Sequence, residues 1–74
     1  MMSDVKTVDA RGLSCPQPAM LAQEALQKLG KGTIEVLVDS STARENVSRL
    51  ARNSDWDVTV EEQPEGSYRI ILRK

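Results

Sequence analysis

The stretch Arg11–Pro18 constrains this chain more than any other. It separates a short β-branched run, Val5–Asp9, from an apolar pattern of helical period that begins directly afterwards. Two of the three prolines, Pro16 and Pro18, and the only cysteine, Cys15, lie within it. Proline fits the first turn of a helix, where its missing N–H is not needed for the hydrogen-bond ladder. The stretch therefore predicts a strand, a turn and a helix in succession.

The middle of the chain continues this alternation. An amphipathic helix follows the prolines and runs to about Lys28. The run Thr33–Asp39 is the strongest strand pattern, because β-branched and apolar residues alternate with polar ones. A second helix opens at Ser40–Thr42, and Thr42 with Glu45 has the spacing of a capping box.

Two strand patterns close the chain, Asp57–Gln63 and Ser67–Arg73, and Pro64–Gly66 supplies the hairpin turn between them. Trp56 is expected to cover the core, since the chain has no Phe and one Tyr. The residues expected to face the core follow the helix and strand periods: Leu21, Ala22, Ala25, Leu26, Leu29, Ile34, Val36, Val38, Ala43, Val47, Leu50, Ala51, Val58, Val60, Tyr68, Ile70 and Leu72.

The order β-α-β-α-β-β predicts one domain over residues 1–74. The expected fold is an α/β (α+β) two-layer sandwich with a mixed four-stranded sheet and two helices on one face. If the first two strands are parallel, the loops at 11–15 and 39–42 emerge at the same end of the sheet. Ligands tend to bind at that end in α/β folds.

Composition excludes several functional classes. Ten Lys and Arg against eleven Asp and Glu give a formal charge of −1, which argues against direct binding of nucleic acid. No apolar run is long enough for membrane insertion. One cysteine and no histidine argue against a disulfide, a metal site or a cofactor site. We expect a protein of a reducing, cytoplasmic compartment.

Cys15 is the one residue that points to chemistry. A thiolate at a helix N-terminus gains about 0.3–1 kcal/mol, which lowers a thiol pKa by less than about one unit. Three neighbours are expected to shape the site of Cys15. Gly12 permits a tight turn before the cysteine, and Gln17 is the nearest backbone donor in the helix. Arg11 is a candidate source of positive charge for the thiolate. The chain has no histidine to serve as a general base and no second cysteine to resolve a disulfide. Intermolecular sulfur transfer through a Cys15 persulfide remains.

The segment Asp9–Pro18, with its Cys-Pro-x-Pro motif, resembles the TusA/SirA/YedF group of small sulfur-carrier proteins, and the likeness covers nearly the whole chain. Residues 43–49 are most similar to the YedF-like branch, which is linked to selenium metabolism. The resemblance implies that Cys15 carries the persulfide, while Pro16 and Pro18 shape the helix start. It also implies a donor protein, either a cysteine desulfurase or a rhodanese-like protein, and an acceptor protein with a reactive cysteine. tRNA thiolation, cofactor sulfuration, and sulfur or selenium metabolism are the processes that such proteins serve.

Two alternatives remain open from the sequence. The chain could be a non-catalytic regulatory module that uses the open sheet face, where Leu37 and Ile71 are expected to be exposed on neighbouring strands. Direct RNA binding by the basic second helix is the weaker alternative, because aromatic residues are scarce. In the carrier interpretation, Arg44 and Arg49 are candidate partner contacts, although a solvated helix face would also account for them.

Overall fold

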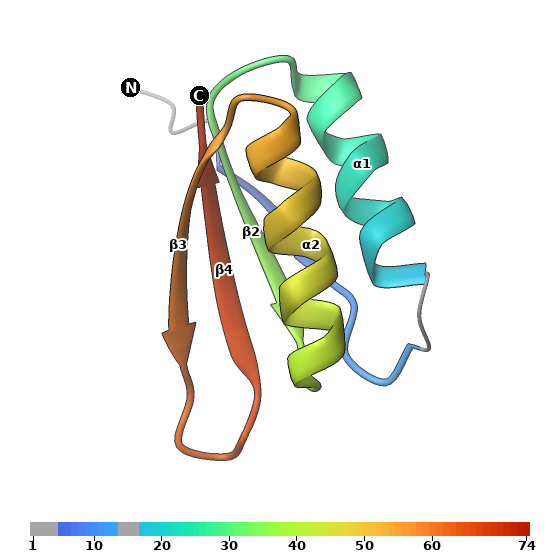
Figure 1. The fold of residues 1–74 in the computed structure, drawn as a ribbon, viewed down its shortest axis with the longest axis vertical. Helices are drawn as coiled ribbons and strands as arrows, with labels where there is room; N and C mark the ends of the chain where they lie inside the picture. Colours follow the sequence, from blue (N-terminus) through green and yellow to red (C-terminus); the bar gives the residue numbers. More distant parts are fainter. Residues whose placement is uncertain (1–4, 14–16) are drawn as a thin grey trace.

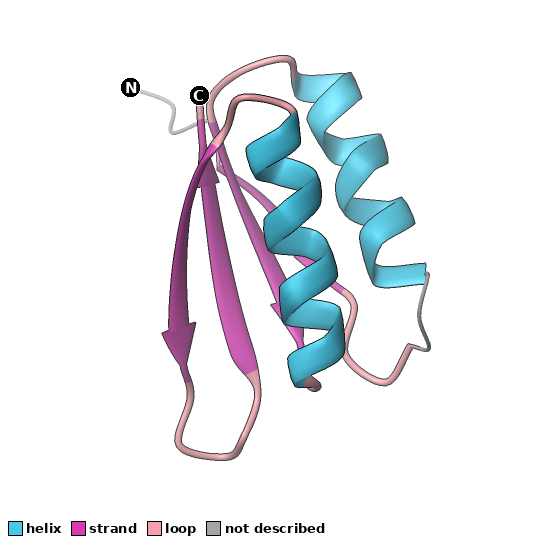
Figure 2. Cartoon of the chain, in the orientation of Figure 1, coloured by secondary structure: helices cyan, strands magenta, loops and turns pink. Residues whose placement is uncertain are grey.

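The computed structural model describes residues 5–13 and 17–74. Within them, six elements follow the expected order: β1 (Val5–Asp9), α1 (Gln17–Leu29), β2 (Thr33–Val38), α2 (Ser41–Asn53), β3 (Asp57–Glu62) and β4 (Tyr68–Arg73). The sheet order is β1-β2-β4-β3, with β1 parallel to β2 and both other pairs antiparallel. Both helices cover the same face of this mixed sheet (Figures 1 and 2). The two-layer sandwich is thus confirmed.

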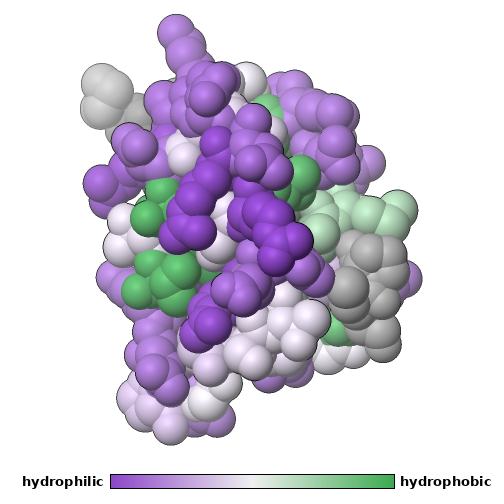
Figure 3. All heavy atoms as spheres, in the orientation of Figure 1, coloured by the Kyte–Doolittle hydropathy of each residue, from purple (hydrophilic) through white to green (hydrophobic). Residues whose placement is uncertain are grey.

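The core lies between the helices and the two central strands. Ile34, Val36 and Val38 of β2 are fully buried and alternate with half-buried neighbours. Val47 of α2 and Trp56 pack into the same cluster. From the helix side, Figure 3 shows a mostly hydrophilic surface in which apolar atoms are confined to limited areas. Within the described residues, neither helix is long and apolar enough to cross a membrane.

The ends of the helices follow local chemistry, with one correction. Gly30 (φ +78°) follows α1, and Asp55 (φ +67°) follows α2, as the turn-forming residues predict. The capping box expected from Thr42 and Glu45 is wrong. Ser40 is the N-cap instead, and its hydroxyl accepts from the Ala43 N–H at 3.1 Å. Thr42 therefore lies inside the first turn of α2.

Edge strand β3 corrects a second expectation. Val60 pairs with the buried Ile70 and so lies on the helix side of the sheet, yet 39% of it is exposed. Edge strands receive less cover from the helices than central strands, and this explains the difference between Val60 and its neighbour. Val60 is accordingly a surface residue rather than a core residue.

The open sheet face does not present the exposed apolar pair that the sequence suggests. Leu37 and Ile71 are each half-buried. Beside them, the Arg69 guanidinium lies 3.6 Å from the Glu35 carboxylate and 3.2 Å from that of Glu61. Charged side chains thus cross the strands over this face, which weakens the case for an apolar docking patch there.

Candidate functional site

One end of the sheet gathers the connections that matter for the candidate site. The described part of the β1–α1 loop, the β2–α2 connection and the β3–β4 hairpin all lie at the lower end of the molecule in Figure 1. This arrangement follows from the parallel pairing of β1 with β2, which brings their carboxyl ends together. The described residues of the two loops therefore lie at the same end of the sheet, as parallel pairing of the first two strands predicts.

A tight turn carries the chain out of β1. The Ala10 N–H donates to the Leu37 carbonyl at 2.8 Å, which extends the parallel ladder by one residue, and Ala10 is buried. The Leu13 N–H then donates to the Ala10 carbonyl at 3.4 Å. Gly12, the third residue of this turn, has a φ of +80°, as a type II turn requires. Gly12 thus has the turn-forming role that the sequence predicts.

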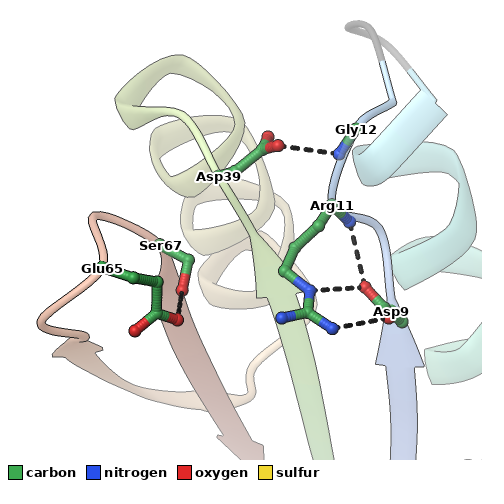
Figure 4. Close-up of polar contacts among 6 residues, drawn as sticks. All are labelled: Asp9, Arg11, Gly12, Asp39, Glu65 and Ser67. Atoms are coloured by element: carbon green, nitrogen blue, oxygen red, sulfur yellow. Dashed lines mark hydrogen bonds and ion pairs between the residues drawn. The ribbon is translucent and has the colours of Figure 1, made fainter.

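Asp39 holds this turn against the end of β2. Its carboxylate accepts a hydrogen bond from the Gly12 N–H at 2.8 Å, across 27 positions of sequence (Figure 4). Asp39 directly follows β2 and precedes Ser40, the N-cap of α2. One carboxylate therefore fixes the position of the β1–α1 turn relative to the β2–α2 connection.

Arg11 is engaged within its own turn. Its Nε and Nη2 atoms donate to the two carboxylate oxygens of Asp9, each at 2.9 Å, and its backbone N–H donates to Asp9 at 3.2 Å (Figure 4). These hydrogen bonds lower the pKa of Asp9 from 3.8 to about 2 and raise the pKa of Arg11. Asp39 and Glu65 add smaller favourable interactions with the Arg11 cation. The positive charge expected near the thiol is thus compensated by carboxylates.

The hairpin supplies one of those carboxylates. The Ser67 hydroxyl donates to the Glu65 carboxylate at 2.6 Å, and this hydrogen bond lowers the pKa of Glu65 (Figure 4). Glu65 therefore stays ionised at neutral pH on the same end of the sheet as Arg11. The described surface around the turn is consequently closer to neutral or acidic than to basic.

The predicted thiol site lies between Leu13 and Gln17. Ser14, Cys15 and Pro16 lie outside the described residues, so the predictions for Cys15 and Pro16 stay predictions. Gln17 is exposed and begins α1, which places Cys15 two positions before a helix of 13 residues. Pro18 occupies the first turn as expected and is also fully buried, a packing role that its sequence position does not reveal.

The two arginines proposed as partner contacts differ in their surroundings. Arg44, in the first half of α2, places its guanidinium 5.0 Å from the centre of the Tyr68 ring, a cation–π contact. Tyr68 pairs with Val38 at the carboxyl end of β2, so Arg44 lies near the end of the sheet at which the three connections lie. Arg49 is exposed and lies five residues further along α2, about 7.5 Å by helical rise. Arg44 therefore lies closer than Arg49 to the end of the sheet at which the three connections lie.

An apolar hollow that the sequence does not predict lies against Leu13 and Gln17, the described residues on either side of the predicted thiol site. It has a volume of about 280 Å³ and is lined by Leu13, Gln17, Met20 and Leu21. Met20 is 61% exposed and Leu13 is 38% exposed, so both apolar side chains are accessible to solvent at this hollow. The position of Met20 outside the apolar stripe of the helix was the available signal.

These features define a class: a two-layer α/β domain with a glycine turn and a helix N-terminus flanking a single cysteine. Comparison with known proteins identifies the family. The chain belongs to the TusA family of sulfur carriers, since the family model described as sulfurtransferase TusA matches residues 6–74.

Two relatives support this assignment. A candidate sulfur carrier protein from Methanocaldococcus jannaschii is 35% identical over 75 residues, covering all of both chains. The crystal structure of a SirA-like protein from Desulfitobacterium hafniense has 31% sequence identity and a TM-score of 0.87, and the match covers 93% of this chain and 95% of that one. Both the TusA/SirA resemblance and the fold expected from it are thereby confirmed.

Proposed function

We propose that Cys15 accepts a sulfane sulfur as a persulfide and relays it to a reactive cysteine of an acceptor protein. Membership of a sulfur-carrier family supports the class of reaction. The observation that carries the proposal for this residue is the start of α1 at Gln17, two positions after the only cysteine in the sequence, because a helix N-terminus stabilises a thiolate.

The proposed step transfers one sulfur atom without net oxidation. The Cys15 thiolate attacks the terminal sulfur of the donor's persulfide, a new S–S bond forms at Cys15, and the donor's S–S bond breaks. The donor cysteine leaves as a thiolate. An acceptor thiolate then attacks the outer sulfur on Cys15, which restores the Cys15 thiolate. Since the sequence contains no second cysteine, the chain itself cannot discharge the persulfide as an internal disulfide.

The donor in this proposal is a cysteine desulfurase or a rhodanese-like protein. The acceptor serves tRNA thiolation, cofactor sulfuration, or sulfur or selenium metabolism. The likeness of residues 43–49 to the YedF-like branch makes selenium a specific alternative cargo. Supplying the desulfurase with selenocysteine in place of cysteine separates these two cargoes by mass.

The loading test is intact mass spectrometry after incubation with a cysteine desulfurase and cysteine, or with thiosulfate and a rhodanese. We expect a gain of one sulfur mass that a reductant removes and that Cys15→Ser abolishes. Asn53→Cys in the Cys15→Ser background is a matched control, since it moves the single thiol to an exposed site at the C-terminal end of α2, away from a helix N-terminus. Equal loading of both cysteine-containing proteins would show that any exposed thiol suffices and would contradict a dedicated role for Cys15.

A further inference from the structure

A groove between edge strand β1 and helix α1 is unused by the proposed sulfur chemistry. Its volume is about 290 Å³. The lining residues that matter here come from both elements: Lys6, Val8, Leu21, Glu24, Ala25 and Lys28. The groove is separate from the hollow beside Leu13, with which it shares Leu21.

The outer edge of β1 offers backbone hydrogen-bonding groups. Among the described residues, β1 pairs with β2 alone and ends the sheet. The Ala10 N–H points to β2, and alternate residues of a strand point their backbone groups to the same side. Those of Val8 therefore also face β2, whereas the N–H and C=O groups of Thr7 face outward. Such an edge is a template for an added strand.

Two side chains of β1 lie on the helix side of the sheet and line the groove. Lys6 pairs in register with Ile34, and Val8 pairs with Val36, and both partners are fully buried beneath the helices. Lys6 and Val8 hence lie on the helix side of the sheet. A strand added beside β1 would place every second side chain on this side, against α1.

The charged residues of the groove are distributed unevenly along its length. β1 runs toward the β1–α1 turn and α1 runs away from it, so Lys6 and Lys28 lie at the end remote from the turn (Figure 1). Neither lysine forms an ion pair with another described residue. Glu24 lies one helical turn closer to the predicted thiol site. The groove is basic at one end, apolar around Val8 and acidic toward the other end.

We propose that this groove binds an extended segment of a partner protein as a strand antiparallel to β1. The segment carries an apolar side chain opposite Val8 and, two residues later, a carboxylate opposite Lys6. Antiparallel addition lets one residue of the segment exchange both backbone hydrogen bonds with Thr7. The carboxylate then lies beside Lys6 and Lys28 on the helix side of the sheet.

A second copy of this chain fits the groove less well. If two β1 strands pair antiparallel about Thr7, Val8 of the copy lies opposite Lys6 and supplies no carboxylate. Asp9 of the copy lies on the opposite face from Lys6, since neighbouring residues of a strand alternate in direction. The charges of the groove thus favour a different partner.

Two peptides of identical composition test this proposal. The first is acetyl-Lys-Thr-Val-Thr-Glu-Thr-amide, in which Val and Glu occupy the stated positions; the second exchanges Lys and Glu. Titration into the ¹⁵N-labelled protein should shift the amide signals of Val5–Asp9 and Lys28. We expect the first peptide to bind about fivefold tighter at low salt, with the difference shrinking as salt is added. Equal affinity, absence of binding, or shifts elsewhere would overturn the proposal.

Reversing the charge of the two lysines in the groove provides a second test of the peptide preference. The double variant Lys6→Glu/Lys28→Glu should prefer the second peptide, while Lys31→Glu/Arg52→Glu, which makes the same charge change at exposed sites outside the groove, should keep the original preference. Persulfide loading of Cys15 should be unchanged in both, which separates this proposal from the proposed sulfur chemistry. Self-association through β1, detected by sedimentation and lost with the first double variant, would assign the groove to a second copy and overturn the proposal.

Discussion

The Gly12 N–H donates to the Asp39 carboxylate at 2.8 Å and thereby joins the turn after β1 to the residue after β2. The contact spans the two loops that lie at the carboxyl ends of β1 and β2. It lies on the N-terminal side of Cys15, three positions away in sequence. The described part of the thiol loop is consequently held by the sheet.

Asp39→Ala should release this turn. A hydrogen bond to an exposed charged group is worth about 1 kcal/mol, so we expect a loss of that size in urea unfolding. The Gly12 amide should also exchange with solvent faster. Asp39→Asn is the matched control because it keeps an acceptor oxygen, and it should retain most of the protection. Equal exchange of the Gly12 amide in all three proteins would show that the contact does not hold the turn.

Substitutions at Gly12 test how much the backbone conformation of the same turn contributes to stability. Its φ of +80° is unfavourable for residues with a Cβ, yet no atom lies within 4 Å of the position that a Cβ would take. Gly12→Ala should therefore destabilise through backbone conformation alone, by about 1–2 kcal/mol. Gly12→Asn should cost less, since Asn tolerates the left-handed region. Urea denaturation of the two variants measures this order, and the reverse order would contradict it.

The ion pair between Asp9 and Arg11 should make the stability of the fold depend on pH in the acidic range. The folded pKa of Asp9, about 2, lies below its ordinary value of 3.8. The stabilisation from this pair is therefore fully present above about pH 4 and is lost as the pH falls toward 2. A carboxyl ¹³C titration should show Asp9 titrating near 2. In Arg11→Gln, the pKa should return toward 3.8, whereas Arg69→Gln should leave Asp9 unchanged.

Val36 and Val60 both pair with Ile70, but replacing each by alanine should lower the free energy of unfolding by different amounts. Val36 is fully buried and Val60 is 39% exposed, although both pair with Ile70 on the helix side of the sheet. Val36→Ala should cost about 2–3 kcal/mol, and Val60→Ala less than about 1 kcal/mol. Similar losses in chemical denaturation would show that the helices cover the β3 edge in solution.

Periodicity and turn chemistry predicted the elements, because those signals are local. The alternation of Ile34, Val36 and Val38 matches β2, and Asp55 ends α2 in the left-handed region as its residue type suggests. The N-cap was missed because Ser40, Ser41 and Thr42 are all chemically able to cap, and the capping-box spacing favoured the wrong one.

Contacts that depend on the fold could not be predicted in this way. The bond from Gly12 to Asp39 joins residues 27 positions apart, and the burial of Val60 depends on where the helices end over the sheet. The sequence offers Arg11 as a source of positive charge for the thiol, but its pairing with Asp9 follows from the geometry of the turn. Which partner a charged side chain such as that of Arg11 pairs with depends on the folded structure.

A sulfur carrier must release its sulfur to another protein as well as accept it, and transfer of labelled sulfur from Cys15 measures this step. The protein is loaded with ³⁴S, separated from its donor, and mixed with a reduced rhodanese-type protein that has one reactive cysteine. We expect the labelled sulfur to move to the second protein while this chain returns to its unmodified mass. Label that stays on Cys15, or leaves as free sulfide without reaching the second protein, would contradict a role as a sulfur carrier.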